Sequence, residues 1–388
     1  MTRPSPSGPI VVVLAALCAC IVAVAVSLLI IDFTEAQGDQ SPIAGDPGIY
    51  EDRMDAIFDG SMPYLDTTLE HLPASVVPMV VVALAARATD VSFTFLWAVA
   101  MTVVFVATVW LWSAQSLPFN AGSRFLVLSL PLLPLAVYRV EPWVVFLASV
   151  SIALALHERW VGSAVMATIA TLAKGWPIAL LAYPWRAGRR VVATLGAVVS
   201  LGVLAAVAAT PGFQDGRAFT GIHSETVVGN LVLVGRHMTS SATGIDMTAG
   251  AAYVDVAALA VLLNLAVGGW FLVRGAIPAM GSYPADRLVI PLGLAVLGIV
   301  LAGPLLSTQF IIWLVPFVMF LARPNRWLFL GIGFASLASI VWWDPSSAIW
   351  AATILARNTM LIALGVLWYR GTTVTDGDTS AASSEQLA

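Results

Sequence analysis

Apolar residues fill most of this 388-residue chain in long blocks, which short polar connections separate. A helix needs roughly 20 apolar residues to cross the hydrocarbon core of a bilayer, and many of the blocks approach that length. The pattern predicts an all-α, polytopic transmembrane bundle of about eleven or twelve helices, which forms one membrane domain over residues 1–370. The expected spans are 9–31, 74–89, 91–113, 121–138, 142–157, 160–183, 189–209, 249–273, 287–304, 307–322, 326–343 and 347–369.

The composition supports a lipid environment and excludes other classes. Apolar residues make up 59% of the chain and charged residues only 10%, whereas a soluble domain carries about 25% charged residues. The net charge of −4 argues against a nucleic-acid partner. Cys18 and Cys20 lie inside the first apolar block and the four histidines are scattered, so we expect no disulfide framework, metal site or other cofactor.

The distribution of arginine predicts the sidedness, because cytoplasmic connections of membrane proteins are rich in Lys and Arg. We expect a multi-pass plasma-membrane protein with both termini in the cytoplasm. The connections assigned to the inner side contain Arg87, Arg139, Arg186, Arg189, Arg190, Arg274, Arg287, Arg323, Arg326 and Arg370. Those assigned to the outer side contain Arg53, Arg124, Arg159, Arg217 and Arg236.

Two long segments, 32–73 and 210–248, are assigned to the outer side, and long loops often carry function. We expect them to form the active site. The tail 371–388 is rich in Thr, Ser and Asp, which predicts a disordered cytoplasmic segment.

The first outer segment contains a predicted amphipathic helix over 49–60. Tyr50, Met54, Ile57 and Phe58 share one face, which could lie on the outer membrane surface. Asp46 falls just ahead of this helix. Spacing alone leaves open whether Asp46 is a functional carboxylate or a residue of the turn that starts the helix.

Several short motifs follow one another in this segment and beyond. The first segment contains Asp46-x-x-x-Tyr50, Gly60-Ser61-Met62-Pro63-Tyr64 and Glu70-His71-Leu72-Pro73. Later stretches are Lys174-Gly175-Trp176-Pro177, Gly221-Ile222-His223-Ser224-Glu225-Thr226 and Leu306-Ser307-Thr308-Gln309-Phe310. In this order they resemble motifs of the GT-C superfamily of polyprenol-phosphate-sugar glycosyltransferases, most of all the branch of PimE-type α-mannosyltransferases of actinobacteria. The chain departs from that pattern at His71, Leu72, Thr220 and Thr308.

The resemblance implies a GT-C-type fold and a defined chemistry. The enzyme would move mannose from a polyprenyl-phosphate donor to a glycolipid or lipoglycan acceptor on the outer face of the membrane. Asp46 would take the proton of the attacking hydroxyl in an inverting reaction. Three alternatives stay open: an arabinofuranosyltransferase with a polyprenyl-phosphate-arabinose donor, a flippase or transporter for a lipid-linked sugar, and a non-catalytic membrane scaffold.

The same resemblance, together with charge and position, provides the candidate substrate-binding residues. They are Tyr50, Tyr64, Glu70, His71, Lys174, His223, Glu225, Arg236, His237 and Gln309. Each has a plainer alternative: a solvated loop acid for Glu70, a lipid headgroup contact for Arg236 and His237, and a position near the inner membrane face for Lys174, whose side chain would reach the headgroups. Arg357 falls within an apolar span, and the sequence identifies no partner for it.

Overall fold

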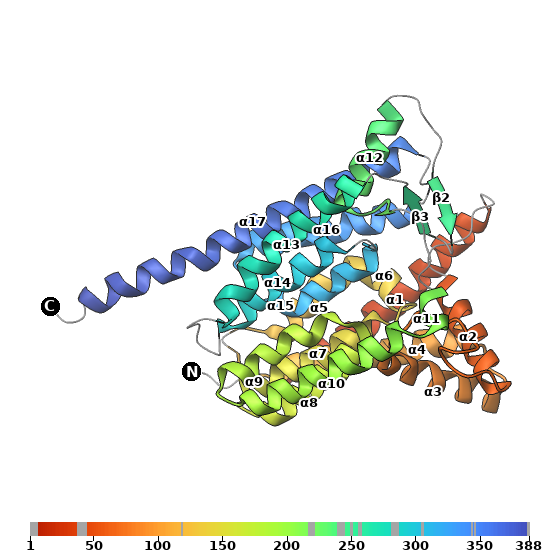
Figure 1. The fold of residues 1–388 in the computed structure, drawn as a ribbon, viewed down its shortest axis with the longest axis horizontal. Helices are drawn as coiled ribbons and strands as arrows, with labels where there is room; N and C mark the ends of the chain where they lie inside the picture. Colours follow the sequence, from red (N-terminus) through yellow and green to blue (C-terminus); the bar gives the residue numbers. More distant parts are fainter. Residues whose placement is uncertain are drawn as a thin grey trace.

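The computed structural model of the protein describes residues 7–36, 45–117, 119–215, 222–238, 245–248, 251–254, 258–280, 287–303, 306–342, 344 and 347–385. Within these ranges the chain is almost entirely helical (Figure 1). Arg217, Thr220 and Gly221, which the sequence analysis placed in the second outer loop, lie outside the described residues.

Helices make up the whole first half of the fold. The elements are α1 (Ser7–Ala36), α2 (Gly45–Phe58), α3 (Pro73–Thr89), α4 (Phe93–Ser113), α5 (Ala121–Ser129), η1 (Leu130–Leu132), α6 (Leu133–Ala136), α7 (Glu141–Leu156), α8 (Trp160–Lys174), η2 (Trp176–Leu181), α9 (Ala182–Arg186), α10 (Arg190–Ala208) and α11 (Pro211–Asp215). The second half adds a small sheet. Its elements are β1 (Ile222–His223), α12 (Val227–Met238), β2 (Ile245–Thr248), β3 (Ala251–Val254), α13 (Ala258–Met280), α14 (Val289–Ala302), η4 (Thr308–Leu314), α15 (Val315–Val318), α16 (Arg323–Val341) and α17 (Ala348–Glu385).

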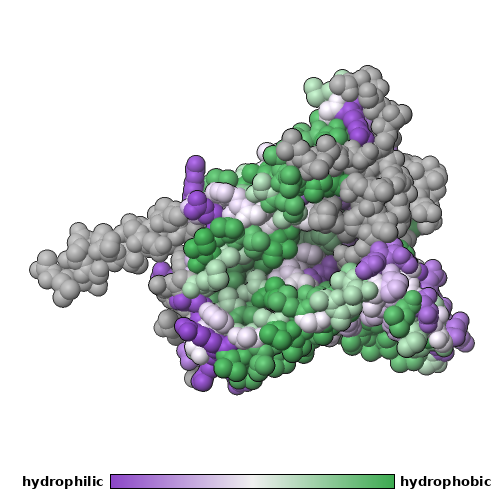
Figure 2. All heavy atoms as spheres, in the orientation of Figure 1, coloured by the Kyte–Doolittle hydropathy of each residue, from purple (hydrophilic) through white to green (hydrophobic). Residues whose placement is uncertain are grey.

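Five helices of the described chain are long and apolar enough to cross a membrane. These stretches are Gly8–Asp32, Phe93–Ser113, Arg190–Ala208, Val261–Met280 and Ala348–Arg370. Shorter apolar helices pack between them, and Figure 2 shows hydrophobic side chains covering much of the described surface between hydrophilic patches at the two ends. The all-α prediction is confirmed, and the helices indicate a membrane protein. The count of eleven or twelve crossings stays a prediction.

A three-stranded antiparallel sheet lies in the region where only a loop and a helix were expected. Its strand order is β1-β3-β2, and Val254 of β3 pairs with both Ile222 and Ile245. Because β3 occupies the start of the expected span 249–273, the helix α13 begins only at Ala258. Short apolar stretches fit a strand and a helix equally well by pattern, which explains this error.

The predicted amphipathic helix is present and begins earlier than expected. Helix α2 starts at Gly45, so Asp46 lies in its first turn and not ahead of it. Tyr50 and Met54 are buried against α3 and α4, and Ile57 and Phe58 pack at the edge of the same cluster. The apolar face of α2 therefore contacts protein.

Helix α3 does not connect the two ends of the bundle, contrary to the span expected at 74–89. Its first turn meets the end of α8, where the Ser75 hydroxyl donates to the Ala173 carbonyl at 2.7 Å, and the start of α7, where Trp143 Nε1 donates to the Ala74 carbonyl at 2.9 Å. Its last turn meets α2 through Arg87 and Asp55. Helix α4 then begins beside α2, since Trp97 packs on Tyr50. We call this end of the bundle, where α2, α3 and α4 begin, the site end.

The expected span 160–183 contains a reversal. Gly175 has a φ of 62°, a conformation that favours glycine, and Pro177 follows in the first turn of η2. Helix α8 therefore ends at Lys174, and η2 and α9 return alongside it, as the close approach of Gly196 to both Thr168 and Leu181 indicates. The differences at 74–89 and 160–183 offset each other, so together they change the ends assigned to the segments between them and leave those after residue 183 unchanged.

Because of these two differences, several basic residues lie at the other end of the bundle from the one expected. Arg87, Arg139 and Lys174 lie at the site end, although they were expected on the inner side or near it. Arg124 and Arg159, which were expected outside, lie at the opposite end. There Arg124 shares a cavity with Arg323 and Arg326, and His157 next to Arg159 hydrogen-bonds Gln115, which follows α4. We call this the arginine end.

Close helix packing between α13 and α14 depends on glycine. A Cβ atom on Gly298 would lie 2.2 Å from the Leu272 nitrogen, and one on Gly268 would lie 2.1 Å from the Ala302 nitrogen. Small residues at such positions let two backbones approach in a membrane bundle. The backbone of α17 runs to Glu385, and the side chains beyond Arg370 lie outside the described residues, so the disordered tail 371–388 stays a prediction.

Candidate functional site

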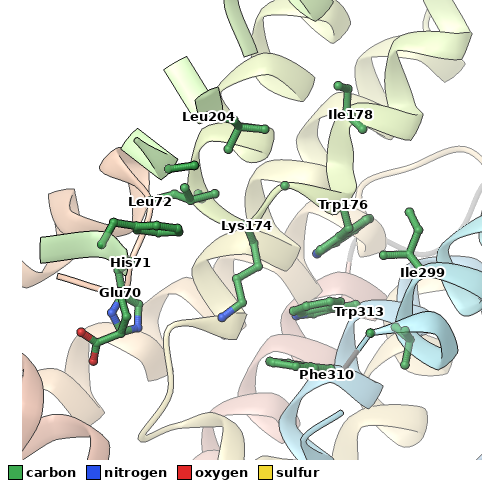
Figure 3. Close-up of a pocket in the computed structure, with 16 residues that line it drawn as sticks. Glu70, His71, Leu72, Lys174, Trp176, Ile178, Leu204, Ile299, Phe310 and Trp313 are labelled. Atoms are coloured by element: carbon green, nitrogen blue, oxygen red, sulfur yellow. The ribbon is translucent and has the colours of Figure 1, made fainter. Parts of the chain in front are cut away.

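A cavity of about 530 Å³ lies at the site end, beside the reversal at Gly175. Its lining combines one polar side with apolar walls. The polar side contains Glu70, His71 and Lys174, and Figure 3 shows the Lys174 ammonium pointing into the space between His71 and a group of aromatic rings.

Three aromatic side chains form the wall facing His71. Trp313 stacks on Phe310 with ring centroids 4.4 Å apart and on Trp176 at 5.8 Å. The Lys174 ammonium lies 5.0 Å from the centre of the Phe310 ring, a cation–π contact. The indole N–H groups of Trp176 and Trp313 are buried and have no hydrogen-bond partner. In Figure 3 both indole nitrogens are turned toward Lys174, so three hydrogen-bond donors converge on one part of the cavity.

The remaining walls are apolar and belong to η2, α10 and α14. They include Ile178, Leu204, Ala208, Ile299 and Val300. Helix α10, which contributes Leu204, also exposes Leu195, Val198 and Leu201 on its surface. The cavity therefore joins a cluster of polar donors to a surface that suits a hydrocarbon chain.

Asp46 lies close to this cavity and does not line it. Its carboxylate forms an ion pair with Arg139, and its Oδ2 atom accepts a hydrogen bond from the Tyr50 hydroxyl at 3.1 Å. The Asp46 side chain remains 25% exposed. Burial lowers the pKa of the Arg139 guanidinium to about 10, against the opposing effect of Glu141 and Glu225, so Arg139 stays charged at neutral pH.

Tyr50 connects Asp46 to the cavity. Its ring meets His71 edge-on with centroids 5.0 Å apart, and His71 lines the cavity. Burial, together with the negative charges of Glu141 and Glu70, raises the pKa of the Tyr50 phenol well above its ordinary value. Tyr50 therefore keeps its proton and serves as a hydrogen-bond donor to Asp46.

The segment after α2 is held by Tyr64. The Tyr64 hydroxyl donates to the His71 carbonyl at 2.7 Å, and the Tyr64 carbonyl accepts from the Gly212 nitrogen at 2.9 Å. Burial raises the pKa of Tyr64 as well. Glu70 lies 3.7 Å from Arg53, measured from Oε2 to Nε, and its side chain reaches the cavity. Tyr64 thus positions the cavity-lining histidine through its backbone.

Lys174 has a partner that the sequence analysis did not consider. Its ammonium lies 3.3 Å from Oε1 of Glu141, which is 1% exposed in the first turn of α7. The pair is within ion-pair distance, although the geometry is not that of a hydrogen bond. Glu141 balances the charge of Lys174, and the remaining ammonium surface faces the cavity.

Glu225 belongs to a third buried pair. Arg357 donates from Nη1 to Glu225 Oε2 at 2.5 Å and from Nη2 to the Glu225 carbonyl at 2.7 Å. The Thr308 hydroxyl donates to the same carboxylate at 2.7 Å. Burial raises the pKa of Glu225, but Arg357, His223 and Thr308 outweigh it, so the pKa lies below its ordinary value. This pair identifies the partner of Arg357.

His223 is buried beside this carboxylate. Its Nδ1 atom accepts a hydrogen bond from the Glu225 nitrogen at 3.3 Å. Burial lowers the pKa of His223, with a raising effect from Glu225 and a lowering effect from Arg357. Neither His223 nor Glu225 lines the described cavity, and substrate binding by them stays a prediction.

The other candidates are dispersed. Gln309 lies in η4 between Thr308 and Phe310, and its side-chain oxygen is buried without a hydrogen-bond partner. Arg236 and His237 lie in the last turn of α12, which Figure 1 shows at the top of the molecule, apart from α2 and α3. They do not line the described cavity.

Sequence reasoning missed Arg139 and Glu141 as site residues. Both lie between two apolar blocks, where charged residues are common in the connection between two membrane spans. The sequence shows two opposite charges close together between two apolar blocks. Only the structure shows that Asp46 and Lys174 lie beside them as ion-pair partners.

The arrangement can bind an anion next to a hydrocarbon chain and can accept a proton at Asp46. Among the described residues, no three His, Cys, Asp or Glu side chains lie close enough to hold a metal ion. Comparison with protein-family models, characterised proteins and solved structures finds no match to this chain.

Proposed function

We propose that the protein is a membrane glycosyltransferase of the GT-C type, which transfers a sugar from a polyprenyl-phosphate donor to a glycolipid or lipoglycan acceptor. The observation that carries the proposal is the convergence of Lys174 Nζ, Trp176 Nε1 and Trp313 Nε1 in a cavity with apolar walls. A lipid phosphate sugar has the matching order of groups: a hydrocarbon chain, an anion and a ring of hydroxyls.

The donor would lie with its phosphate at Lys174. An ammonium held by one buried carboxylate can still stabilise a phosphate, whose charge grows as the bond to the sugar breaks. The indole N–H groups would donate to phosphate or sugar oxygens, which would satisfy both of them. The hydrocarbon chain would follow Ile178, Leu204 and Ile299.

Asp46 would serve as the base. The acceptor hydroxyl attacks the anomeric carbon, the bond from that carbon to the phosphate oxygen breaks, and the hydroxyl proton passes to the carboxylate. Arg139 and Tyr50 hold the Asp46 carboxylate in place, and its remaining exposed surface is open to an acceptor. The lipid phosphate leaves as an anion, so no acid is required.

Transfer from radiolabelled polyprenyl-phosphate-mannose in membranes tests the proposal. We expect Asp46→Asn to fold and to lose transfer by at least about a hundredfold, the usual scale of general-base catalysis. Asp52→Asn is the matched control, because Asp52 is an exposed carboxylate on the same helix. Equal activity of wild type and Asp46→Asn would exclude Asp46 as the base.

The donor itself is tested with a second label. Transfer from polyprenyl-phosphate-arabinose and none from the mannose donor would support a glycosyltransferase and identify arabinose, instead of mannose, as the transferred sugar. A wild-type protein inactive with both donors at matched expression would overturn the proposed function. Trp313→Phe keeps an aromatic ring and removes the indole N–H, and we expect it to raise KM for the donor more than it lowers kcat.

A further inference from the structure

A second cavity, of about 240 Å³, lies at the arginine end between α5 and α16. Its lining contains three arginines, Arg124, Arg323 and Arg326, and no acidic residue. The other lining residues are Ser123, Val127, Leu128, Trp327 and Leu330. Three guanidinium groups around one cavity repel one another, and an anion would relieve that repulsion.

The hydrogen bonds of these arginines leave their charge uncompensated. Arg124 donates from Nη1 to the Met319 carbonyl at 3.1 Å, and Arg326 donates from Nη1 to the Leu321 carbonyl at 3.2 Å. Arg323 lies over the Trp327 ring at 5.9 Å. Neutral carbonyls and a ring hold the side chains in place, and none of the ion pairs in the described part of the chain includes these three residues.

The surroundings of the cavity point to lipid as the source of the anion. Val127 of α5 and Trp327 and Phe334 of α16 are exposed apolar side chains, and so is Leu130, which directly follows α5. A tryptophan beside arginines at the edge of an apolar surface is typical of the boundary between headgroups and acyl chains. A soluble anion would make no apolar contact with the surface next to the arginines, whereas the acyl chain of a lipid would.

We propose that this cavity between α5 and α16 binds the phosphate of an anionic phospholipid, with Arg124, Arg323 and Arg326 around the phosphate and an acyl chain along Val127 and Trp327. Planar guanidinium groups match phosphate oxygens in paired hydrogen bonds. The site is separate from the cavity at Lys174 and does not depend on the proposed glycosyl transfer.

The experiment is native mass spectrometry of the purified, delipidated full chain with added phosphatidylglycerol or phosphatidylcholine. We expect the wild type to retain phosphatidylglycerol and not phosphatidylcholine. Each arginine should contribute about fivefold in affinity, so Arg323→Gln should bind about fivefold more weakly and the double change Arg323→Gln with Arg326→Gln about 25-fold more weakly. Arg323 makes no hydrogen bond to the backbone among the described contacts, so its single variant tests the site without removing a tertiary contact.

Arg190→Gln is the matched control. Arg190 is the first residue of α10 and lies over the Trp185 ring at 5.7 Å, as Arg323 is the first residue of α16 over Trp327, but Arg190 does not line the cavity. Retention of phosphatidylglycerol should be unchanged in this variant. Equal binding of both lipids, or an equal loss in Arg190→Gln and Arg323→Gln, would overturn the proposal. Displacement of the lipid by millimolar inorganic phosphate would also overturn it in favour of a soluble anion.

Discussion

The two ends of the bundle use charge in opposite ways. At the site end acids and bases pair within the protein, and the most buried pairs of the described residues are Asp46 with Arg139, Glu141 with Lys174 and Glu225 with Arg357. At the arginine end Arg124, Arg323 and Arg326 surround a cavity without an acidic partner among its lining residues. Buried charge must be paired to be tolerated, whereas charge near the headgroups can be compensated by solvent or lipid.

The comparison explains why similar residue types serve different purposes. Pairing at the site end fixes the positions of carboxylates and cations relative to one another, as the proposed transfer reaction would require. It also leaves those residues sensitive to loss of either partner. The arginines of the arginine end should tolerate substitution with little loss of stability, because solvent or lipid headgroups can compensate their charge.

The largest effect should follow from breaking the innermost pair. Arg357 is 0% exposed, so Arg357→Met leaves the Glu225 carboxylate buried without its cation and should lower the free energy of unfolding by about 3–5 kcal/mol. Thermal unfolding in detergent measures the change. Arg323→Gln at the arginine end provides the comparison and should stay within about 0.5 kcal/mol of wild type. Similar losses in the two variants would contradict the contrast between the ends.

A smaller effect is expected at the cavity. Lys174→Met leaves Glu141 unpaired, but the Lys174 side chain is partly exposed, so the loss of unfolding free energy should be about 2–3 kcal/mol. Adding Glu141→Gln should restore much of the stability, because it removes the unpaired charge. Donor binding should stay weak in the double variant. A double variant that binds donor like wild type would show that Lys174 only neutralises Glu141.

The smallest effect concerns pH. The pKa of His223 is lowered in the folded protein, so the unfolded chain binds the proton more readily and stability falls as pH drops below about 6.5. The loss should not exceed about 1.4 kcal/mol per pH unit for this single group. His223→Gln should flatten the dependence of unfolding temperature on pH between 8 and 6.

His157 provides the control for this measurement. It lies at the arginine end, exposed and hydrogen-bonded to Gln115 at 2.9 Å. His157→Gln removes a histidine that is far from Glu225 and Arg357. If the pH dependence of the unfolding temperature disappeared in His157→Gln and persisted in His223→Gln, the prediction for His223 would be refuted.

The sequence by itself determined the helical class and the apolar character of the chain. Both depend on local composition, since a long apolar segment in lipid must pair its backbone N–H and C=O groups within itself, and a helix does so. The amphipathic face of α2, with Tyr50 and Met54, was equally readable, because the spacing of side chains around one helix is fixed by its geometry. Asp46, His71 and Lys174 were also identified as candidates from short motifs and charge.

Only the tertiary structure decided which of these residues meet. Whether α3 crosses the bundle depends on what its two ends pack against, and no property of its 17 residues distinguishes the two orientations. The reversal at Gly175 likewise placed Lys174 beside Glu141 and the aromatic wall. Pairs such as Glu225 with Arg357, 132 positions apart, depend on how distant helices pack, which local patterns do not contain.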